Sequence, residues 1–271
     1  MNRKPVILPY DGFGDKENLF REIARDLDNP GITELLSFLK FNDAVFIPDV
    51  HGPGLMWFVW QELKKRNLQD QIGIFLDLKL ADTSGTLKNI AKHFASYQQS
   101  ILTVRSSLSG KGYLEIRRTL PGVKIALVSF LTDNSEQDCL EQYGLFPEEK
   151  ILHDMRIAQK KYARLRQKED PEFAFDMVVS SPNELAYLQR NEIPLFGRRF
   201  EKITPGIRDK WMAKGQQERI SGVAQALLDG ANFVVMGSQM KNGNPANGIS
   251  AQESQALTKA EIEKAFQAIN D

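Results

Sequence analysis

Short apolar runs alternate with amphipathic segments from one end of the chain to the other. Continuous apolar runs indicate strands that are buried on both faces, as strands of parallel sheets are. The expected strands are residues 6–8, 36–41, 73–76, 101–104, 123–131, 173–179, one within 194–203, and 232–236. Between them, apolar residues recur at helical spacing. The expected helices are residues 19–27, 56–63, 87–94, 110–119, 147–172, 182–190, 216–228 and 258–269.

About eight strand–helix units within 271 residues predict a single-domain (β/α)8 barrel over residues 1–271. A doubly wound open sheet is the alternative, and it would carry a glycine-rich phosphate fingerprint after its first strand. Gly12-Phe13-Gly14 stands at that place, but the third glycine of the fingerprint is missing. We therefore favour the barrel.

Two segments depart from the regular alternation. Residues 147–172 form one long charged segment, and Pro147 followed by two glutamates is a favourable helix start. Its apolar stripe comprises Ile151, Met155, Ile157, Ala158, Tyr162 and Leu165. The stripe predicts a long barrel helix with a solvent-facing side, and a docking surface for a partner is the alternative. Residues 241–250, rich in Asn, Gly and Pro, predict a mobile loop after the eighth strand.

Composition narrows the class of protein. Acidic and basic residues balance at 35 each, so no net field favours nucleic acid or a membrane surface. The single cysteine, Cys139, excludes an intrachain disulfide and fits a reducing compartment. No apolar stretch approaches the length of a membrane span, and the run 5–9 is too short for a signal peptide. We expect a cytoplasmic protein without a zinc site, since His51, His93 and His153 lack ligand spacing.

The stretch 75–86 carries the most distinctive chemistry. An apolar strand runs directly into Asp77 and Lys79, which point to the same side of a strand, and Asp82 follows in a polar turn. Charges at the end of a buried strand are costly unless they are paired. A plain structural ion pair is one interpretation, and a functional site is the other.

Further polar residues follow other expected strands. In a barrel the functional side chains lie where strands run into the following loops. These positions hold Asp11, Lys40, Thr132, the segment 204–208 ending in Arg208, and Gly237-Ser238. Two lysines and three acids are thus expected to converge on one mouth, where opposite charges must interleave to be stable.

The pattern Asp77-x-Lys79-x-x-Asp82 resembles the signature of the orotidine 5′-phosphate decarboxylase superfamily. By this resemblance, Asp11 matches the acid that closes strand one and holds the ribose. Lys40 matches the strand-two lysine of the charged tetrad. Thr86 matches the threonine that crosses to the site of the partner subunit.

The resemblance covers most of the chain. Leu131-Thr132 resembles the pair that meets the pyrimidine, and Val178–Ser181 with Glu184 resembles the strand-six segment. Thr204-Pro205-Gly206-Ile207-Arg208 is similar to the motif after strand seven. Gly215-Gln216-Gln217 resembles the glutamine segment that reaches the phosphate, which makes Gln216 and Gln217 candidate ligands.

Three positions depart from the family pattern. Gly237 is followed by Ser238 where the family has a phosphate-binding arginine, Arg105 stands for a histidine, and Thr83-Ser84 for Ile-Pro. An arginine–phosphate contact is worth on the order of 1.5–3 kcal/mol. Its loss weakens binding by roughly one to two decades unless Arg208 or Arg105 compensates.

The resemblance implies decarboxylation of orotidine 5′-phosphate to uridine 5′-phosphate without a metal or organic cofactor. In that reaction Lys79 is the expected acid that protonates the carbanion, and Asp77 lies beside the substrate carboxylate. Lys40 and Asp82 complete an alternating row of charges. The family lends the last aspartate from a second subunit, which implies a homodimer in which Asp82 and Thr86 are shared.

Two other functions remain open on the sequence. A sugar-phosphate decarboxylase or aldolase of the same superfamily shares the Asp-x-Lys-x-x-Asp pattern but uses magnesium. A non-catalytic nucleotide-binding relative is the second, and Ser238 is the feature that favours it. Lys79 and the two acids, Asp77 and Asp82, are all present, which argues against a relative that has lost its catalytic activity.

Overall fold

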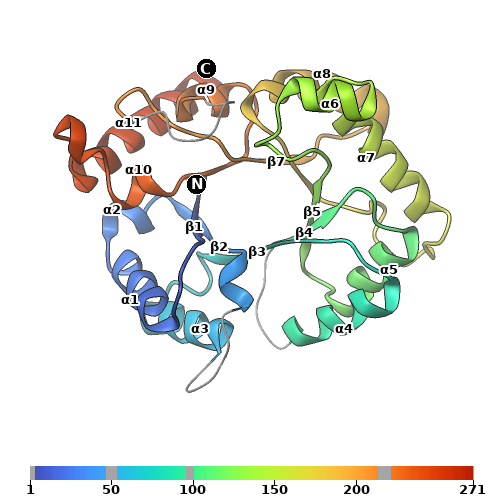
Figure 1. Ribbon diagram of the computed structural model, residues 1–271, viewed down its shortest axis with the longest axis horizontal. Helices are drawn as coiled ribbons and strands as arrows, with labels where there is room; N and C mark the ends of the chain where they lie inside the picture. The colour runs from blue at the N-terminus through green and yellow to red at the C-terminus, as the bar shows by residue number, and fades with distance from the viewer. Residues whose placement is uncertain (1–3, 47–53, 96–100, 213–220, 271) are drawn as a thin grey trace.

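Eight parallel strands close into a barrel in the computed structural model, which describes residues 4–46, 54–95, 101–212 and 221–270. Each strand pairs with the next in chain order, and β8 returns to pair with β1. Seen along its shortest axis, the molecule has helices arranged in a ring around these strands (Figure 1). The predicted (β/α)8 fold is confirmed.

The strands match the expected apolar runs in number and order. They are β1 (Val6–Tyr10), β2 (Leu36–Phe41), β3 (Gly73–Leu80), β4 (Ile101–Arg105), β5 (Lys124–Val128), β6 (Met177–Val179), β7 (Glu201–Thr204) and β8 (Phe233–Val235). The α-helices of the described ranges are α1 (Lys16–Leu27), α2 (Pro30–Thr33), α3 (Leu55–Lys65), α4 (Ser84–Phe94), α5 (Gly110–Thr119), α6 (Glu136–Tyr143), α7 (Pro147–Ala163), α8 (Leu185–Phe196), α9 (Val223–Leu228), α10 (Ser238–Lys241) and α11 (Ala251–Asn270). Short 3-10 turns lie at Asp43–Phe46, Pro182–Glu184 and Pro245–Asn247.

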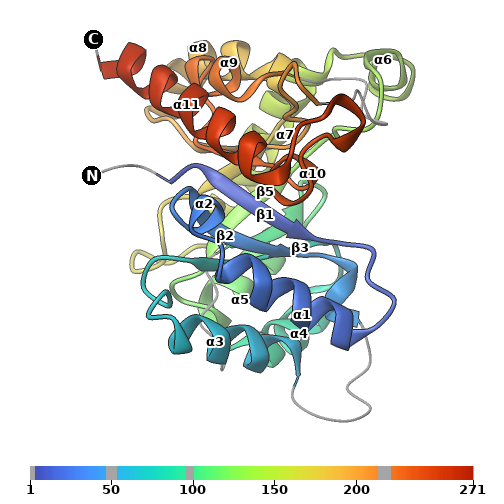
Figure 2. The ribbon, with the colours of Figure 1, turned by 90° about the vertical axis from the view of Figure 1, so that its left-hand side faces the viewer.

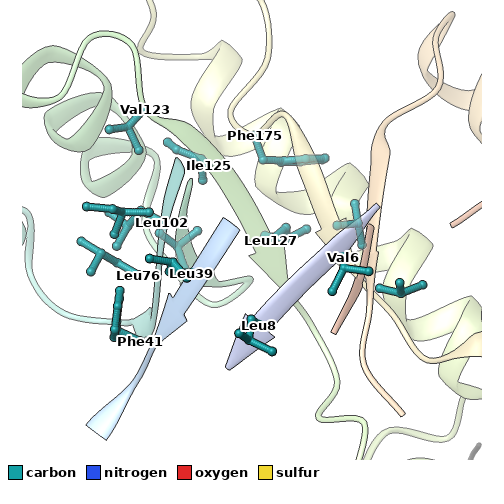
Figure 3. Close-up of a cluster of buried hydrophobic side chains, with 14 of the residues drawn as sticks. Val6, Leu8, Leu39, Phe41, Leu76, Leu102, Val123, Ile125, Leu127 and Phe175 are labelled. Atoms are coloured by element: carbon teal, nitrogen blue, oxygen red, sulfur yellow. The ribbon is translucent and has the colours of Figure 1, made fainter. Parts of the chain in front are cut away.

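Alternate residues of each strand face two different apolar layers. The inner layer fills the barrel with Ile7, Phe75, Ile101, Ala126, Met177, Ile203 and Phe233. The outer layer lies between strands and helices, where the paired residues Leu76 and Leu102 pack together (Figure 3). Turned by 90°, the molecule has α1, α3 and α4 on one side of the strands and α8, α9 and α11 on the other (Figure 2).

Two predicted strands, 123–131 and 173–179, are too long at one end, and the strand expected within 194–203 lies at the end of that range. β5 ends at Val128 rather than at residue 131, because Phe130 and Leu131 turn to line a cavity. β6 begins at Met177 and β7 at Glu201. The apolar character of 173–200 outside these strands comes from a cluster in which Phe173, Phe175 and Phe196 all pack against Phe200.

The helical predictions differ in extent. The short helix α6 was not predicted, and α7 ends at Ala163, so the segment 164–172 is not helical. Of the predicted stripe on α7, Ile157 and Leu165 are exposed, while its other members are buried against the barrel. α8 extends to Phe196 and contains Pro194, and α11 begins seven residues before the predicted start at Thr258.

Helix α7 also contributes a polar anchor to the barrel. The carboxylate of Asp154 accepts hydrogen bonds from Ser106 Oγ (2.5 Å), from Ser129 Oγ (2.6 Å) and from Lys150 Nζ (2.5 Å). Ser106 and Ser129 directly follow β4 and β5. Burial raises the pKa of Asp154, but these hydrogen bonds outweigh it, and the pKa is lowered. α7 is thereby tied to the strand ends at the mouth of the barrel.

The segment 241–250 has local structure. Lys241 Nζ donates to the carbonyl oxygen of Pro9 (3.0 Å) and lies 3.6 Å from the centroid of the Tyr10 ring. Asn244 pairs with Ile249, and its side-chain amide donates to the carbonyl oxygen of Trp211 (2.6 Å). The mobility expected for this loop stays a prediction.

Within the described ranges, no helix is both long enough and apolar enough to cross a membrane. The cytoplasmic location stays a prediction.

A buried ion pair joins β7 to α8. Lys202 on β7 contacts Glu192 on α8, and their side chains are 3% and 0% exposed. Glu192 also accepts a hydrogen bond from the backbone N–H of Phe200 (3.3 Å). Burial raises the pKa of Glu192 and lowers the pKa of Lys202, so each charge depends on the other.

We predict that Lys202→Met lowers the free energy of unfolding by about 3–5 kcal/mol, because it leaves the Glu192 carboxylate buried without its counter-ion. The double variant Lys202→Met/Glu192→Gln should recover most of this loss, since the amide oxygen still accepts from Phe200. Urea unfolding of both variants measures the difference, with Lys168→Met on the exposed surface as the control. A single variant as stable as the parent chain would contradict the interpretation.

Candidate active site

A cavity of about 330 Å³ opens at the carboxyl ends of the strands. This volume is in the range of small-molecule sites. Its polar lining consists of Asp11, Lys40, Asp77, Lys79, Thr132, Arg208, Ser238 and Gln239. Its apolar lining includes Pro9, Phe75, Phe130, Ile203, Pro205 and Val235. A ligand with a flat apolar part and several charged groups would fit such a lining.

Four charged side chains of alternating sign form a row along one wall. Lys40 Nζ lies 2.9 Å from Asp11 Oδ2 and 3.4 Å from Asp77 Oδ2. Lys79 Nζ lies 2.9 Å from the same oxygen of Asp77. β1, β2 and β3 are hydrogen-bonded neighbours, so their ends bring the four groups together. We call Asp11, Lys40, Asp77 and Lys79 the charged row.

Asp77 is the most constrained member of the charged row. Its side chain is 13% exposed, and its Oδ1 accepts a hydrogen bond from Thr103 Oγ1 (3.0 Å) on β4. Burial raises the pKa of Asp77, but attraction to Lys40 and Lys79 and the hydrogen bonds outweigh burial and lower the pKa. Asp77 is therefore ionised at neutral pH.

Lys79 has an unusual backbone. Its φ of 47° lies in the left-handed region, which is uncommon for a residue other than glycine. The regular pairing of β3 with β4 is interrupted between Leu76 and Leu80, and the N–H of Lys79 donates instead to Thr103 Oγ1 (2.8 Å). This conformation turns Lys79 into the cavity with Asp77 and Phe75. Strained backbone of this kind is concentrated at functional sites.

Asp82 and Thr86 lie outside the cavity of their own chain. Asp82 is exposed and accepts a hydrogen bond from the N–H of Thr83 (2.6 Å). Thr86 is also exposed, in the first turn of α4, with its hydroxyl 3.1 Å from that of Thr83. Within one chain, Asp11 is the acid at the far end of the charged row from Lys79. The predicted sharing of Asp82 and Thr86 with a partner subunit stays a prediction.

The remaining predicted residues divide into three groups. Thr132, Pro205, Arg208, Gly237 and Ser238 line the cavity, as expected for residues that follow strands. Arg105 ends β4 and is not part of the lining. Gln216 and Gln217 lie outside the described residues.

Two residues of the site were missed by the sequence analysis. Thr103 is a polar residue inside an apolar strand, and that contrast was a usable signal. Gln239 lines the cavity but is 2% exposed, and nothing in its surroundings along the chain marks it. Its partners are far away in the sequence.

No group of three or more His, Cys, Asp and Glu side chains in the described part of the chain is arranged to hold a metal ion. Independence from metal stays a prediction.

A closed parallel barrel with a cavity at the carboxyl ends of its strands has the architecture of a (β/α)8 enzyme. Residues 46–248 match the family model described as "Orotidine 5'-phosphate decarboxylase / HUMPS family". The chain belongs to this family.

Individual relatives agree with the family match. A protein of Fusobacterium nucleatum named orotidine 5'-phosphate decarboxylase is 30% identical over 240 residues, covering 83% of this chain and 91% of the relative. A protein of the same name from Staphylococcus epidermidis is 30% identical over 222 residues, covering 78% and 87%. The crystal structure of orotidine 5'-phosphate decarboxylase from Lactobacillus acidophilus shares the fold, with a TM-score of 0.64 and 23% identity over 96% of this chain and 99% of that chain.

We predict that Lys40→Met raises the pKa of Asp77, because the variant removes the strongest attraction that opposes burial. Carbon-13 NMR titration of the Asp77 carboxyl group measures this pKa, with Lys168→Met as the control.

In the parent chain the pKa of Asp77 in the folded state lies below its pKa in the unfolded state. The stability contributed by ionised Asp77 is therefore present above the unfolded pKa and is lost as the pH falls through the folded pKa. In Lys40→Met this loss should begin at higher pH. An unchanged pKa of Asp77 in this variant would mean that Lys79 and Thr103 alone are enough to keep that pKa low.

Proposed function

We propose that this protein decarboxylates orotidine 5′-phosphate to uridine 5′-phosphate and so acts in pyrimidine biosynthesis. The contact between Lys79 and Asp77 (2.9 Å) inside the charged row is the observation on which the proposal depends. Family membership and the names of the relatives support the same reaction.

The substrate carboxylate would lie beside Asp77. Two unit charges about 4 Å apart repel by roughly 4 kcal/mol at an effective dielectric constant near 20. The repulsion disappears when neutral carbon dioxide leaves, so it favours the reaction only if the rest of the substrate is firmly bound. Asp77 cannot move away, since Lys40, Lys79 and Thr103 all bind it.

Lys79 would be the proton donor. When the bond to carbon dioxide breaks, its electron pair stays on the pyrimidine carbon as a carbanion. A neighbouring ammonium stabilises that charge and then transfers its proton to the carbon. The contact with Asp77 fixes the position of Lys79 before the reaction. No metal or organic cofactor takes part in this scheme.

The other end of the substrate would bind across the cavity. Arg208, Ser238 and the backbone near Gly237 are the proposed phosphate ligands, and all three line the cavity. Asp11 is proposed to bind the ribose, while Thr132 and Pro205 face the base. Gln216 and Gln217 are proposed to reach the phosphate. Binding energy from this remote end would hold the reacting end in place.

A homodimer would complete the site. Asp82 and Thr86 are exposed and lie outside the cavity of their own chain, as residues offered to a partner subunit would. In the dimer, the partner's Asp82 would extend the charged row beyond Lys79.

Two other functions are distinguished by experiment. A magnesium-dependent sugar-phosphate enzyme would lose activity in excess chelator. A non-catalytic nucleotide-binding protein would bind uridine 5′-phosphate but not consume the substrate, and Ser238 in the cavity is the observation that favours it.

We predict that the purified protein consumes orotidine 5′-phosphate equally in buffer and in excess chelator, and that Lys79→Ala reduces turnover by at least about 10³-fold. A loss of this size is within the range of rate that general acid catalysis contributes. Ultraviolet absorbance follows the reaction, and Lys168→Ala, an exposed lysine, is the control. Unchanged turnover in Lys79→Ala would disprove the assignment of the proton donor.

We also predict that two inactive variants complement each other. Lys79→Ala and Asp82→Asn, mixed after dissociation and reassociation, should recover about a quarter of the parent activity, since half of the dimers are mixed and each has one complete site. An inactive mixture in which mixed dimers are detected by mass spectrometry would place Asp82 in the site of its own chain.

A further inference from the structure

The loop after β7 and the short helix α10 after β8 both line the cavity. The loop after β7 contributes Gly206, Ile207 and Arg208, and the segment after β8 contributes Ser238 and Gln239. Among the cavity-lining cations of the described chain, Lys40 and Lys79 belong to the charged row, and Arg208 comes from the loop after β7. The position of Arg208 therefore depends on how this loop is held.

A reciprocal pair of hydrogen bonds joins the loop after β7 to α10. The backbone N–H of Asp209 donates to Gln239 Oε1 (3.0 Å), and Gln239 Nε2 donates to Asp209 Oδ2 (2.5 Å). Asp209 and Gln239 are 7% and 2% exposed. Hydrogen bonds of buried charged groups are strong when they are made and costly when one partner is lost.

Two further elements are attached to the same pair. The N–H of Val223, at the start of α9, donates to Asp209 Oδ1 (3.0 Å). Gln239 Nε2 also donates to Thr258 Oγ1 (2.9 Å) on α11. Gly222 permits the close approach, because a Cβ there would lie 2.8 Å from Asp209 Oδ1. Asp209 and Gln239 thus connect the loop after β7 and α10 to α9 and α11.

Arg208 and Ser238 are the chain neighbours of this pair. The backbone of Arg208 is held on one side by its N–H bond to the carbonyl oxygen of Ser221 (2.9 Å) and on the other by Asp209. The side-chain amide of Gln239 is fully used by Asp209 and Thr258, so Gln239 acts through its neighbours.

We propose that Asp209 and Gln239 are positioning residues that hold Arg208 and Ser238 in place to bind the substrate phosphate. The inference rests on the proposed function for the identity of the ligand. The pair touches no reacting atom, so its loss weakens binding of the phosphate end and leaves recognition of the nucleoside unchanged. In the arrangement seen here, the Asp209–Gln239 pair supports the wall that carries Ser238 in place of the usual arginine.

The test uses matched ligands with and without phosphate. Calorimetry measures the affinity of uridine 5′-phosphate and of uridine for the full chain and for Gln239→Glu, which sets two carboxylates against each other. We expect the affinity for the phosphorylated ligand to fall about tenfold or more, the scale of one charge-assisted contact, and the affinity for uridine to stay within about twofold. KM for orotidine 5′-phosphate should rise in parallel, while kcat changes less.

The double variant Asp209→Asn/Gln239→Glu exchanges the carboxylate and the amide and should restore part of the affinity, since the new carboxylate cannot donate to Thr258 Oγ1. Gln225→Glu, an exposed residue of α9, is the charge control. Equal losses for both ligands, or no recovery in the double variant, would overturn the inference, as would a parent chain that binds no uridine 5′-phosphate. A parent chain that binds this nucleotide with the expected pattern but consumes no substrate would remove the proposed function and leave the positioning role intact.

Discussion

The charged row at the ends of β1, β2 and β3 is the constraint on which the rest of the site depends. Each inner member has an opposite charge on both sides, so the attractions offset the loss of hydration at the barrel mouth. Removing Lys40 would leave Asp11 and Asp77 facing each other. The row is stable only as a whole, and the parallel pairing of β1 with β2 and of β2 with β3 sets the three strand ends side by side in this order.

The surrounding structure accommodates the local strain of this row. Lys79 departs from regular strand geometry, and Thr103 accepts the N–H that the sheet no longer pairs. The inner apolar layer, which includes Phe75, fills the barrel interior next to the charged row and so supports it. Above β4 and β5, Asp154 ties α7 to the strand ends. A rigid scaffold is what allows a preorganised electrostatic site.

Two parts of the cavity lining are held in place by different kinds of interaction. The charged row uses ion pairs between adjacent strands, whereas the part of the lining with Arg208 uses the Asp209–Gln239 pair between the loop after β7 and α10. In the proposed reaction, the charged row would carry out the chemistry, and the part of the lining with Arg208 would supply binding energy. A bound substrate would link the two, since both line the same cavity.

Periodicity alone determined the number, order and type of the strand–helix units, because buried parallel strands and amphipathic helices have distinct apolar patterns. It also placed Asp77, Lys79 and Lys40 at strand ends. Tertiary structure alone decided which charges meet, since contacts across strands depend on barrel closure and register. For that reason the contact of Asp11 with Lys40 could be seen only in the structure. The bond between Asp209 and Gln239 spans 30 positions, and no local pattern can encode such a contact.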